Sequence, residues 1–324
     1  MLQLPFLVPL VIIEREDIMN KPIISVCIPT YNRANYLHHA LQCILKQLKT
    51  SNLKKKIEIV ISDNNSQDNT SQVVKKYSEE FKFISYRKNK KNIGIINTVK
   101  VAEFAHGEYV WFTSDDDWHI SLSISTVLRI IEEFQPDAII SNLDLYSKDG
   151  DRILDPNLLR TKDNFFGGKK DFFHFLEGKF FLPIDWYLTT YSNTIVKTNI
   201  FRKNKSLFKK FSEGRFIFPH KYITFYTPED MSIYVVAKSL IAFRADNRSF
   251  GVKDKNKFLI DWYKTLRIHY NSLYTFNKKY LSTKFSFLLY VKQSLRSLRL
   301  RFLLLFGIDI SDFLVKYFYK KERN

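Results

Sequence analysis

Short apolar segments alternate with amphipathic ones between residues 22 and 120. Apolar, β-branched runs at 23–29, 57–62, 83–87 and 109–112 have the length and composition of buried strands. In the segments between these runs, apolar residues recur every three or four positions, which is typical of helices that pack on a sheet. This alternation predicts an α/β fold in which helices flank a mostly parallel sheet.

The pattern is looser after residue 120 but still contains regular elements. Apolar positions within 122–134 predict a helix, and 137–143 has the composition of a strand. An aromatic-rich segment at 172–181 predicts a second helix, and 187–196 predicts a second strand. A less regular half therefore follows the first half of the fold.

The composition indicates a folded protein that binds something anionic. The chain has 324 residues, of which 45% are hydrophobic and 16% aromatic, so a core can form and wholesale disorder is excluded. The formal net charge of +18 predicts attraction to nucleic acid, a membrane surface or phosphorylated substrates. Cys27 and Cys43 fit no metal-ligand spacing and no disulfide framework, which indicates a reducing compartment.

Three consecutive carboxylates, Asp115, Asp116 and Asp117, come just after the apolar run at 109–112. Neighbouring like charges repel one another, so packing alone gives no reason to line them up. Carboxylates are good ligands for Mg²⁺ or Mn²⁺, and open α/β sheets bind ligands at the carboxyl ends of their strands. The sequence therefore predicts a metal and phosphate site here, with a solvated acidic turn as the alternative.

Four short motifs occur in order near the ends of the predicted strands, and the fourth contains the three carboxylates. They are Ser25–Arg33, Val60–Ser66, Asn92–Gly94 and Ser114–Trp118. Together they resemble the motifs of the inverting, nucleotide-sugar-dependent glycosyltransferases of family 2. The resemblance covers about residues 22–120 and implies a GT-A fold, a Rossmann-like α/β architecture with a C-terminal helical extension in this chain.

The resemblance implies roles for single residues. Asp116 matches the metal ligand, Asp115 matches a ribose or neighbouring partner, and Asp117 takes a variable position. Tyr31 matches a position where an aromatic ring stacks on the base, and Asp63 matches an acceptor for the base. The full set implied for nucleotide binding is Pro29, Thr30, Tyr31, Arg33, Asp63, Asn92, Gly94, Asn97, Ser114 and Asp115.

The chain departs from the family pattern at Thr113, where many members have an additional acid. This leaves one carboxylate fewer beside the expected Mn²⁺ or Mg²⁺. The donor substrate implied is a nucleotide-diphosphate sugar. A metal on its diphosphate neutralises charge on the leaving group, while a general base removes the proton of the attacking hydroxyl.

The identity of the general base stays open between several residues. Most of the family uses an acid from a Glu-Asp pair, and the pair that ends in Asp230 here precedes a predicted strand rather than a helix. The stretches 218–222 and 243–251 are similar to a subset that includes the abequosyltransferases of O-antigen synthesis. That similarity puts a histidine, a residue type well suited to a base, at a helix start. The candidates are His220, Asp230, Asp185 and Asp246.

Three segments follow from these patterns. Residues 1–18 are expected to be either a loosely held N-terminal extension or a misassigned upstream start. Their apolar run is shorter than the roughly 20 residues that span a bilayer. Residues 19–255 form the catalytic domain, with the nucleotide half at 22–120 and the acceptor half at 121–255. Residues 256–324 form a basic amphipathic tail that either docks on an anionic membrane or packs on the domain.

The predicted function is transfer of a sugar, with inversion, to a saccharide or polyprenyl-linked glycan in O-antigen, capsule or lipooligosaccharide synthesis. The expected location is the cytoplasm, with peripheral attachment to the inner face of the cytoplasmic membrane. One alternative is a catalytically inactive, nucleotide-binding family member, against which the Asp115-Asp116 pair argues. The other is a basic nucleic-acid-binding protein, against which the spread of basic residues and the lack of a known motif argue.

Overall fold

The structure is a computed structural model, and parts of the chain lie outside its description. The expectations for residues 1–18, Asp185, His220, Asp246 and the tail at 256–324 all fall on those parts. The described residues are 21–48, 52–147, 149–177, 190–212, 227 and 230–244.

Ten strands of the described chain form one sheet in the order β3-β2-β1-β4-β9-β6-β10-β5, with β7 paired to β6 and β8 paired to β10. The strands are β1 (Ile24–Thr30), β2 (Ile57–Asp63), β3 (Ile84–Lys88), β4 (Tyr109–Phe112), β5 (Trp118–His119), β6 (Ala138–Tyr146), β7 (Ile153–Asp155), β8 (Asn164–Phe166), β9 (Thr194–Lys197) and β10 (Ile233–Arg244).

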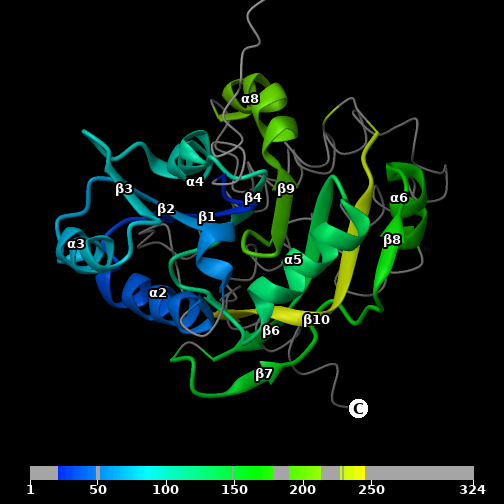
Figure 1. The fold of residues 1–324 in the computed structure, drawn as a ribbon, viewed down its shortest axis with the longest axis horizontal. Helices are drawn as coiled ribbons and strands as arrows, with labels where there is room; N and C mark the ends of the chain where they lie inside the picture. The colour runs from blue at the N-terminus through cyan, green and yellow to red at the C-terminus, as the bar shows by residue number, and fades with distance from the viewer. Residues whose placement is uncertain are drawn as a thin grey trace, which may run out of the picture.

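Helices and short 3₁₀ turns connect these strands and cover the sheet (Figure 1). They are α2 (Ala34–Leu48), η1 (Asn52–Lys56), α3 (Thr70–Glu80), η2 (Gly94–Ile96), α4 (Asn97–Lys100), η3 (Val101–Phe104), α5 (Ser123–Phe134), α6 (Lys169–Glu177) and α8 (Thr198–Ser212).

The first four strands, β3, β2, β1 and β4, are all parallel, as the alternation of apolar and amphipathic segments predicted. The chain leaves β1 toward β2 on one side and later returns to β4 on the other side. Such a reversal of strand order opens a crevice at the carboxyl ends of the two strands that flank it. Strand β9 then runs antiparallel between β4 and β6, and β10 runs parallel to β6.

The sheet has a hydrophobic core on each face, because successive side chains of a strand point to opposite faces. In β4, Trp111 packs with helices α2 and α5, whereas Phe112 packs with α4 and α8. Figure 1 shows α2 and α3 on one side of the parallel strands and α4 and α8 on the other. The near-continuous apolar runs of the sequence thus reflect strands that are buried on both faces.

Two predicted elements differ from the structure. The helix expected between the apolar runs at 83–87 and 109–112 is broken into η2, α4 and η3, and the Thr98 hydroxyl donates to the Ile95 carbonyl at 2.7 Å within these short turns. The strand expected at 187–196 includes, among the described residues, only its end in β9. Residues 190–193 do not extend this strand, and Ser192 instead hydrogen-bonds the acidic segment after β4.

Asp68 holds the N-termini of two helices at once. One carboxylate oxygen accepts from the backbone N–H of Ala34 at 3.0 Å, and the other accepts from the N–H of Thr70 at 3.1 Å. These are the first residues of α2 and α3, whose first N–H groups have no partner inside the helix. Partial burial acts against ionisation, but the hydrogen bonds from Thr70 and Ala34 outweigh it and lower the pKa of Asp68.

We expect the substitution Asp68→Ala to lower the free energy of unfolding by about 1–2 kcal/mol, because it removes the cap of two helices. Denaturant unfolding at pH 7 measures this difference. A carboxyl group with a lowered pKa stabilises the fold above its ordinary pKa near 4, and this contribution is lost as the pH falls. The difference between the variant and the wild type should therefore shrink below about pH 4.

The control is Glu79→Ala, which removes an exposed carboxylate that pairs with Lys75 within α3. Exposed pairs of this kind contribute about 0.3–0.5 kcal/mol. A loss in Asp68→Ala no larger than in this control would contradict the capping role.

Candidate active site

The register of the parallel strands brings three polar positions into line. In β1 and β4, Cys27 lies opposite Phe112, and three further residues along each strand lead to Thr30 and Asp115. Thr30 in turn lies opposite Asp63 of β2. The Thr30 hydroxyl donates to Asp115 Oδ2 at 2.7 Å, so the alignment continues beyond the end of β4. Thr30 at the end of β1 therefore lies between two carboxylates, Asp63 at the end of β2 and Asp115 beyond the end of β4.

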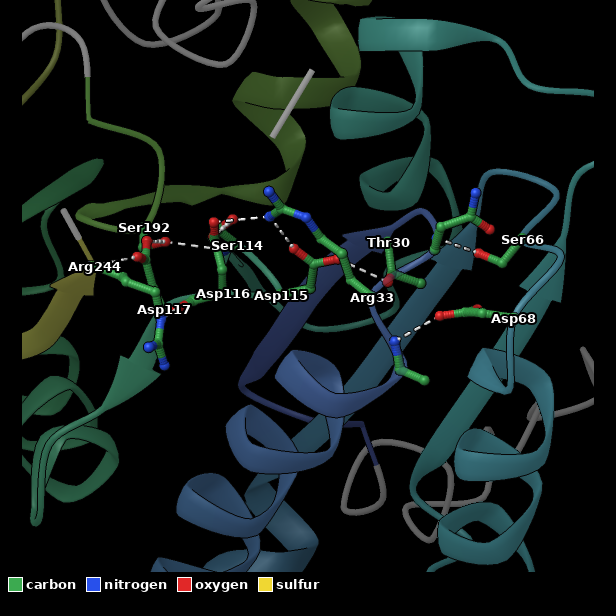
Figure 2. Close-up of polar contacts among 12 residues, drawn as sticks. Thr30, Arg33, Ser66, Asp68, Ser114, Asp115, Asp116, Asp117, Ser192 and Arg244 are labelled. Atoms are coloured by element: carbon green, nitrogen blue, oxygen red, sulfur yellow. Dashed lines mark hydrogen bonds and ion pairs between the residues drawn. The ribbon is translucent and has the colours of Figure 1, made fainter. Parts of the chain in front are cut away.

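Arg33 lies between the first two aspartates (Figure 2). Its Nη1 is 3.1 Å from Asp115 Oδ1 and 2.7 Å from Asp116 Oδ2. The Ser114 hydroxyl donates to the other oxygen of Asp116. The resemblance had implied that Arg33, Ser114, Asp115 and Asp116 belong to one site, and the structure brings all four together.

Burial dominates the electrostatics of this group. Burial and the neighbouring Asp116 raise the pKa of Asp115 to about 6, although Arg33 and the Thr30 hydroxyl act in the opposite direction. For Arg33, burial favours the neutral form, but Asp115 and Asp116 outweigh it and raise the pKa. The guanidinium is therefore a permanent positive charge between two carboxylates.

Asp117 points away from this group and joins three segments of the chain. Its carboxylate accepts from the Ser192 hydroxyl and, at 3.2 Å, from the backbone N–H of Arg244. Ser192 also accepts from the N–H of Ser114 at 2.9 Å. Burial and the charge of Asp116 raise the pKa of Asp117 well above its ordinary value. A position that the resemblance marked as variable is thus a buried junction in this chain.

The ends of β2 and β3 continue the polar site beyond β1. Asp63 is buried and accepts from the backbone N–H of Ser66 at 2.7 Å and from the Tyr86 hydroxyl at 2.6 Å. The turn at 63–66 is therefore held by Asp63 itself, whereas the cap of α3 comes from Asp68. Tyr31 follows β1 with 40% of its surface exposed, so its ring is accessible to a ligand.

An amide network holds the loop that contains Asn92 and Gly94. The side-chain amide of Asn64 donates to Asn92 Oδ1 at 2.8 Å and to the Gly94 carbonyl at 3.2 Å. Gly94 has a φ of 61°, a conformation that residues with a Cβ adopt at a cost, which explains the glycine. Asn97 is buried and donates to the Ser62 carbonyl at 2.7 Å, so it braces β2.

The candidate base Asp230 lies elsewhere. It accepts from the backbone N–H of Lys169 at 2.7 Å, the first residue of α6, and it precedes β10. The 12 residues of β10 separate it from Arg244, which contacts the aspartates at the other end of that strand. The structure therefore does not bring Asp230 to the crevice. His220, Asp185 and Asp246 lie outside the described residues.

Two residues at this site were given no role by the sequence. Antiparallel pairing puts Ala242 of β10 opposite Trp118, and continuing this register leads to Arg244 and Asp116. Arg244 Nε donates to the Asp116 carbonyl at 3.3 Å. The second residue, Tyr36, lies near both arginines. The centre of its ring is 5.7 Å from the guanidinium carbon of Arg33 and 5.1 Å from that of Arg244. Tyr36 shows in the sequence only as a member of an apolar helix stripe.

Thr113 is the position at which the sequence departs from the family pattern. It is buried, and its hydroxyl is 3.1 Å from His119 Nε2, so it does not face the crevice carboxylates. Burial lowers the pKa of His119 to about 3, which keeps this imidazole neutral. The described residues contain no cluster of three or more His, Cys, Asp or Glu side chains that could hold a metal.

The donors that remain still fit a hard divalent cation. Asp115 and Asp116 offer carboxylate oxygens at one edge of the sheet, which are ligands suited to Mn²⁺ or Mg²⁺. Two carboxylates are enough when phosphate oxygens and water complete the coordination. The metal ion would therefore be held mainly by the oxygens of a bound diphosphate and by Asp116.

We expect Asp117→Ala to lower the free energy of unfolding by about 2–4 kcal/mol, because it leaves the Ser192 hydroxyl and the Arg244 N–H without an acceptor. Asp117→Asn retains one oxygen for Arg244 and an amide that can donate to Ser192, so it should cost less than about 1 kcal/mol. Denaturant unfolding of the three proteins makes this comparison. Equal losses in both variants would show that the charge of Asp117, and not its hydrogen bonds, holds the junction.

Comparison with known proteins identifies the family and the fold of this chain. The model of the family described as "Glycosyl transferase family 2" matches residues 25–250. The abequosyltransferase RfbV of Salmonella typhimurium is 32% identical over 263 residues, which are 79% of this chain and 76% of that protein. A Campylobacter jejuni enzyme, GalNAc(5)-diNAcBac-PP-undecaprenol beta-1,3-glucosyltransferase, is 34% identical over 114 residues, 35% of each chain.

Among solved structures, the crystal structure of Staphylococcus aureus TarS 1-349 in complex with UDP superposes with a TM-score of 0.55 at 19% identity. The match covers 78% of this chain and 65% of the TarS chain, and at this identity it shows the fold alone. The mixed, mostly parallel sheet with flanking helices is the GT-A architecture, as predicted. The match to the family model, together with the RfbV relative, shows a sugar-transferring enzyme: the chain belongs to glycosyltransferase family 2.

Proposed function

We propose that this chain transfers a hexosyl or deoxyhexosyl group from a nucleoside-diphosphate sugar to a hydroxyl group of a glycan, with inversion at the anomeric carbon. The observation that carries the proposal is the position of Asp115 and Asp116 at the carboxyl ends of β1 and β4. Asp115 accepts a hydrogen bond from Thr30 at the end of β1, and Asp116 pairs with Arg33 just after β1. Enzymes of this family typically combine a nucleotide sugar with a divalent metal. The metal that accompanies the diphosphate would be bound by the carboxylate oxygens at this point.

The nucleoside is proposed to lie along the ends of β1 and β2. Tyr31 offers an exposed ring for stacking, and the Asp63 turn offers polar groups near the base. Asn92 and Gly94 stand at the rim of the same crevice, held by Asn64. TarS, which shares this fold, was crystallised in complex with UDP, which supports a nucleotide as ligand of this chain.

The diphosphate is proposed to lie over Asp115 and Asp116. Asp116 would hold Mn²⁺ or Mg²⁺, whose chemistry when bound is to offset the charge that grows on the leaving nucleoside diphosphate. Asp115 and the Thr30 hydroxyl orient this edge through their hydrogen bond at 2.7 Å. Arg244 holds the backbone of Asp116 from the other side. These contacts pre-organise the site, so that little reorganisation is needed during the reaction.

The acceptor is proposed to be a saccharide or a polyprenyl-linked glycan in the synthesis of a bacterial surface polysaccharide. RfbV is an abequosyltransferase, and the name of the Campylobacter enzyme gives an undecaprenol-linked acceptor. Inversion requires a base on the face opposite the leaving group. His220 is the preferred candidate, followed by Asp185 or Asp246, whereas Asp230 caps α6 and is withdrawn from this proposal.

The domain limits proposed are 19–255 for the catalytic domain and 256–324 for the basic tail. Among the residues that the structure describes, no helix is long and apolar enough to cross a membrane. Attachment to the inner face of the cytoplasmic membrane is proposed to occur through the tail, where basic residues alternate with apolar ones.

We expect Asp116→Asn to reduce turnover by at least about a hundredfold, since metal stabilisation of leaving-group charge supplies several kcal/mol. The fold should persist, because the side chain lies at a strand end rather than in a core. Titration of the protein with UDP, GDP, CDP and dTDP, with and without Mn²⁺, should show that the Mn²⁺-dependent gain in affinity is lost. The control is Asp171→Asn, an exposed carboxylate on α6. A full Mn²⁺ effect in Asp116→Asn would place the metal elsewhere.

We expect the double substitution Arg299→Glu and Arg301→Glu to reduce binding to vesicles that contain anionic lipid, since each basic residue near such a surface contributes about 1 kcal/mol. Co-sedimentation with phosphatidylglycerol vesicles at low and high salt measures this. The matched control is Lys54→Glu with Lys55→Glu, two exposed cations of η1. Equal losses in both double variants would show that net charge, and not the tail, drives binding.

A further inference from the structure

A single guanidinium nitrogen neutralises both carboxylates at which the metal is expected. Arg33 Nη1 contacts Asp115 and Asp116 at 3.1 and 2.7 Å, and the three side chains are only 11%, 5% and 10% exposed. Water therefore screens these charges little, and the ion pairs are strong. Arg33 occupies the space between the two carboxylates from which a metal would be held.

Every oxygen of the two carboxylates already has a donor from the chain. Asp115 accepts hydrogen bonds from Arg33 and Thr30, and Asp116 accepts hydrogen bonds from Arg33 and Ser114. The hydroxyl groups of Thr30 and Ser114 are neutral and can remain beside a cation. The guanidinium cannot, because two positive charges in contact with the same buried oxygens repel each other strongly. A divalent metal must therefore displace Arg33 before it binds Asp116 directly.

The displaced side chain has a suitable place to go. Arg33 lies in the loop between β1 and α2, at the crevice where the proposed diphosphate lies, and its guanidinium carbon is 5.7 Å from the Tyr36 ring. A planar guanidinium makes paired hydrogen bonds to phosphate oxygens, with a geometry that a lysine cannot reproduce. One rotation of the side chain would thus exchange carboxylate partners for phosphate partners.

We propose that Arg33 is an exchangeable counter-ion: it pairs with Asp115 and Asp116 in the empty site and moves to the diphosphate when a divalent cation takes the carboxylates. The inference rests on the proposed function and adds a residue that opposes metal binding in the absence of donor. Metal and nucleotide then bind cooperatively, because the phosphate gives the released guanidinium a new partner. The two buried carboxylates therefore have a positive partner both in the empty site, from Arg33, and in the loaded site, from the cation.

The test uses the full chain with Arg33→Gln and two separate binding measurements. With Mn²⁺ alone, followed by the paramagnetic resonance signal of free Mn²⁺, the variant should bind at least about fivefold more tightly than the wild type, since a competing charge is removed. With saturating Mn²⁺, the best nucleoside diphosphate among UDP, GDP, CDP and dTDP should bind about tenfold more weakly, since a charged hydrogen-bond donor is lost. The two changes have opposite signs.

Two further variants separate exchange from a structural role. Arg33→Lys keeps the charge but not the paired hydrogen bonds, so Mn²⁺ affinity should stay within about threefold of the wild type while nucleotide affinity falls. Arg129→Gln removes an exposed arginine of α5 that pairs with Glu133, and it should change neither measurement. Thermal unfolding measurements establish whether each variant is folded. If Arg33→Gln does not fold, Arg33→Lys still tests the inference.

Unchanged or weaker Mn²⁺ binding by Arg33→Gln would overturn the inference, because Arg33 would then not oppose the metal. Unchanged nucleotide affinity in both Arg33 variants would also overturn it. These results differ from a failure of the proposed function, which would appear in the wild type as nucleotide binding that is independent of Mn²⁺.

Discussion

Three consecutive buried carboxylates are the constraint on which the rest of this site depends. A buried carboxylate without donors is costly, so Asp115, Asp116 and Asp117 must each find partners in the fold. Asp115 and Asp116 share Arg33, and Asp117 takes Ser192 and the Arg244 N–H. These partners come from the loop after β1, the segment before β9 and the end of β10. Satisfying the carboxylates therefore assembles the site.

The pairing register of the sheet supplies these partners. Parallel pairing of β1 with β4 brings Thr30 to Asp115, and antiparallel pairing of β4 with β9 brings Ser192 opposite Ser114. A slip of one residue would turn each side chain to the other face of the sheet. The two hydrophobic cores, which bury both faces, fix that register, so packing far from the crevice determines the charge arrangement within it.

The junction at Asp117 connects two parts of the chain that lie far apart in sequence. The acidic segment follows the parallel strands β1 to β4, whereas Ser192 and Arg244 come from the later part that contains β9 and β10. Arg244 also lies over Trp118 and beside Tyr36, so it contacts the first part of the chain through both its backbone and its side chain. Buried polar contacts next to the proposed metal ligand therefore hold the two parts together.

Local patterns were sufficient for the parallel strands, for the acidic strand end and for the family to which the chain belongs. Strands β1, β2 and β4 read as apolar runs because they are buried on both faces, and the motif residues follow directly at their ends. The broken helix after Gly94 was missed, since short 3₁₀ turns have the same apolar spacing as a helix.

The amino-acid sequence by itself determined the α/β class, the strand ends and Asp115 and Asp116 as the acidic pair. Only the tertiary structure decided their partners, the role of Asp117 and the distance of Asp230 from the crevice. Ser192 is 75 residues and Arg244 127 residues from Asp117 in the chain. Such contacts depend on the order and register of strands, which arise from packing over the whole sheet and leave no local signal in the sequence.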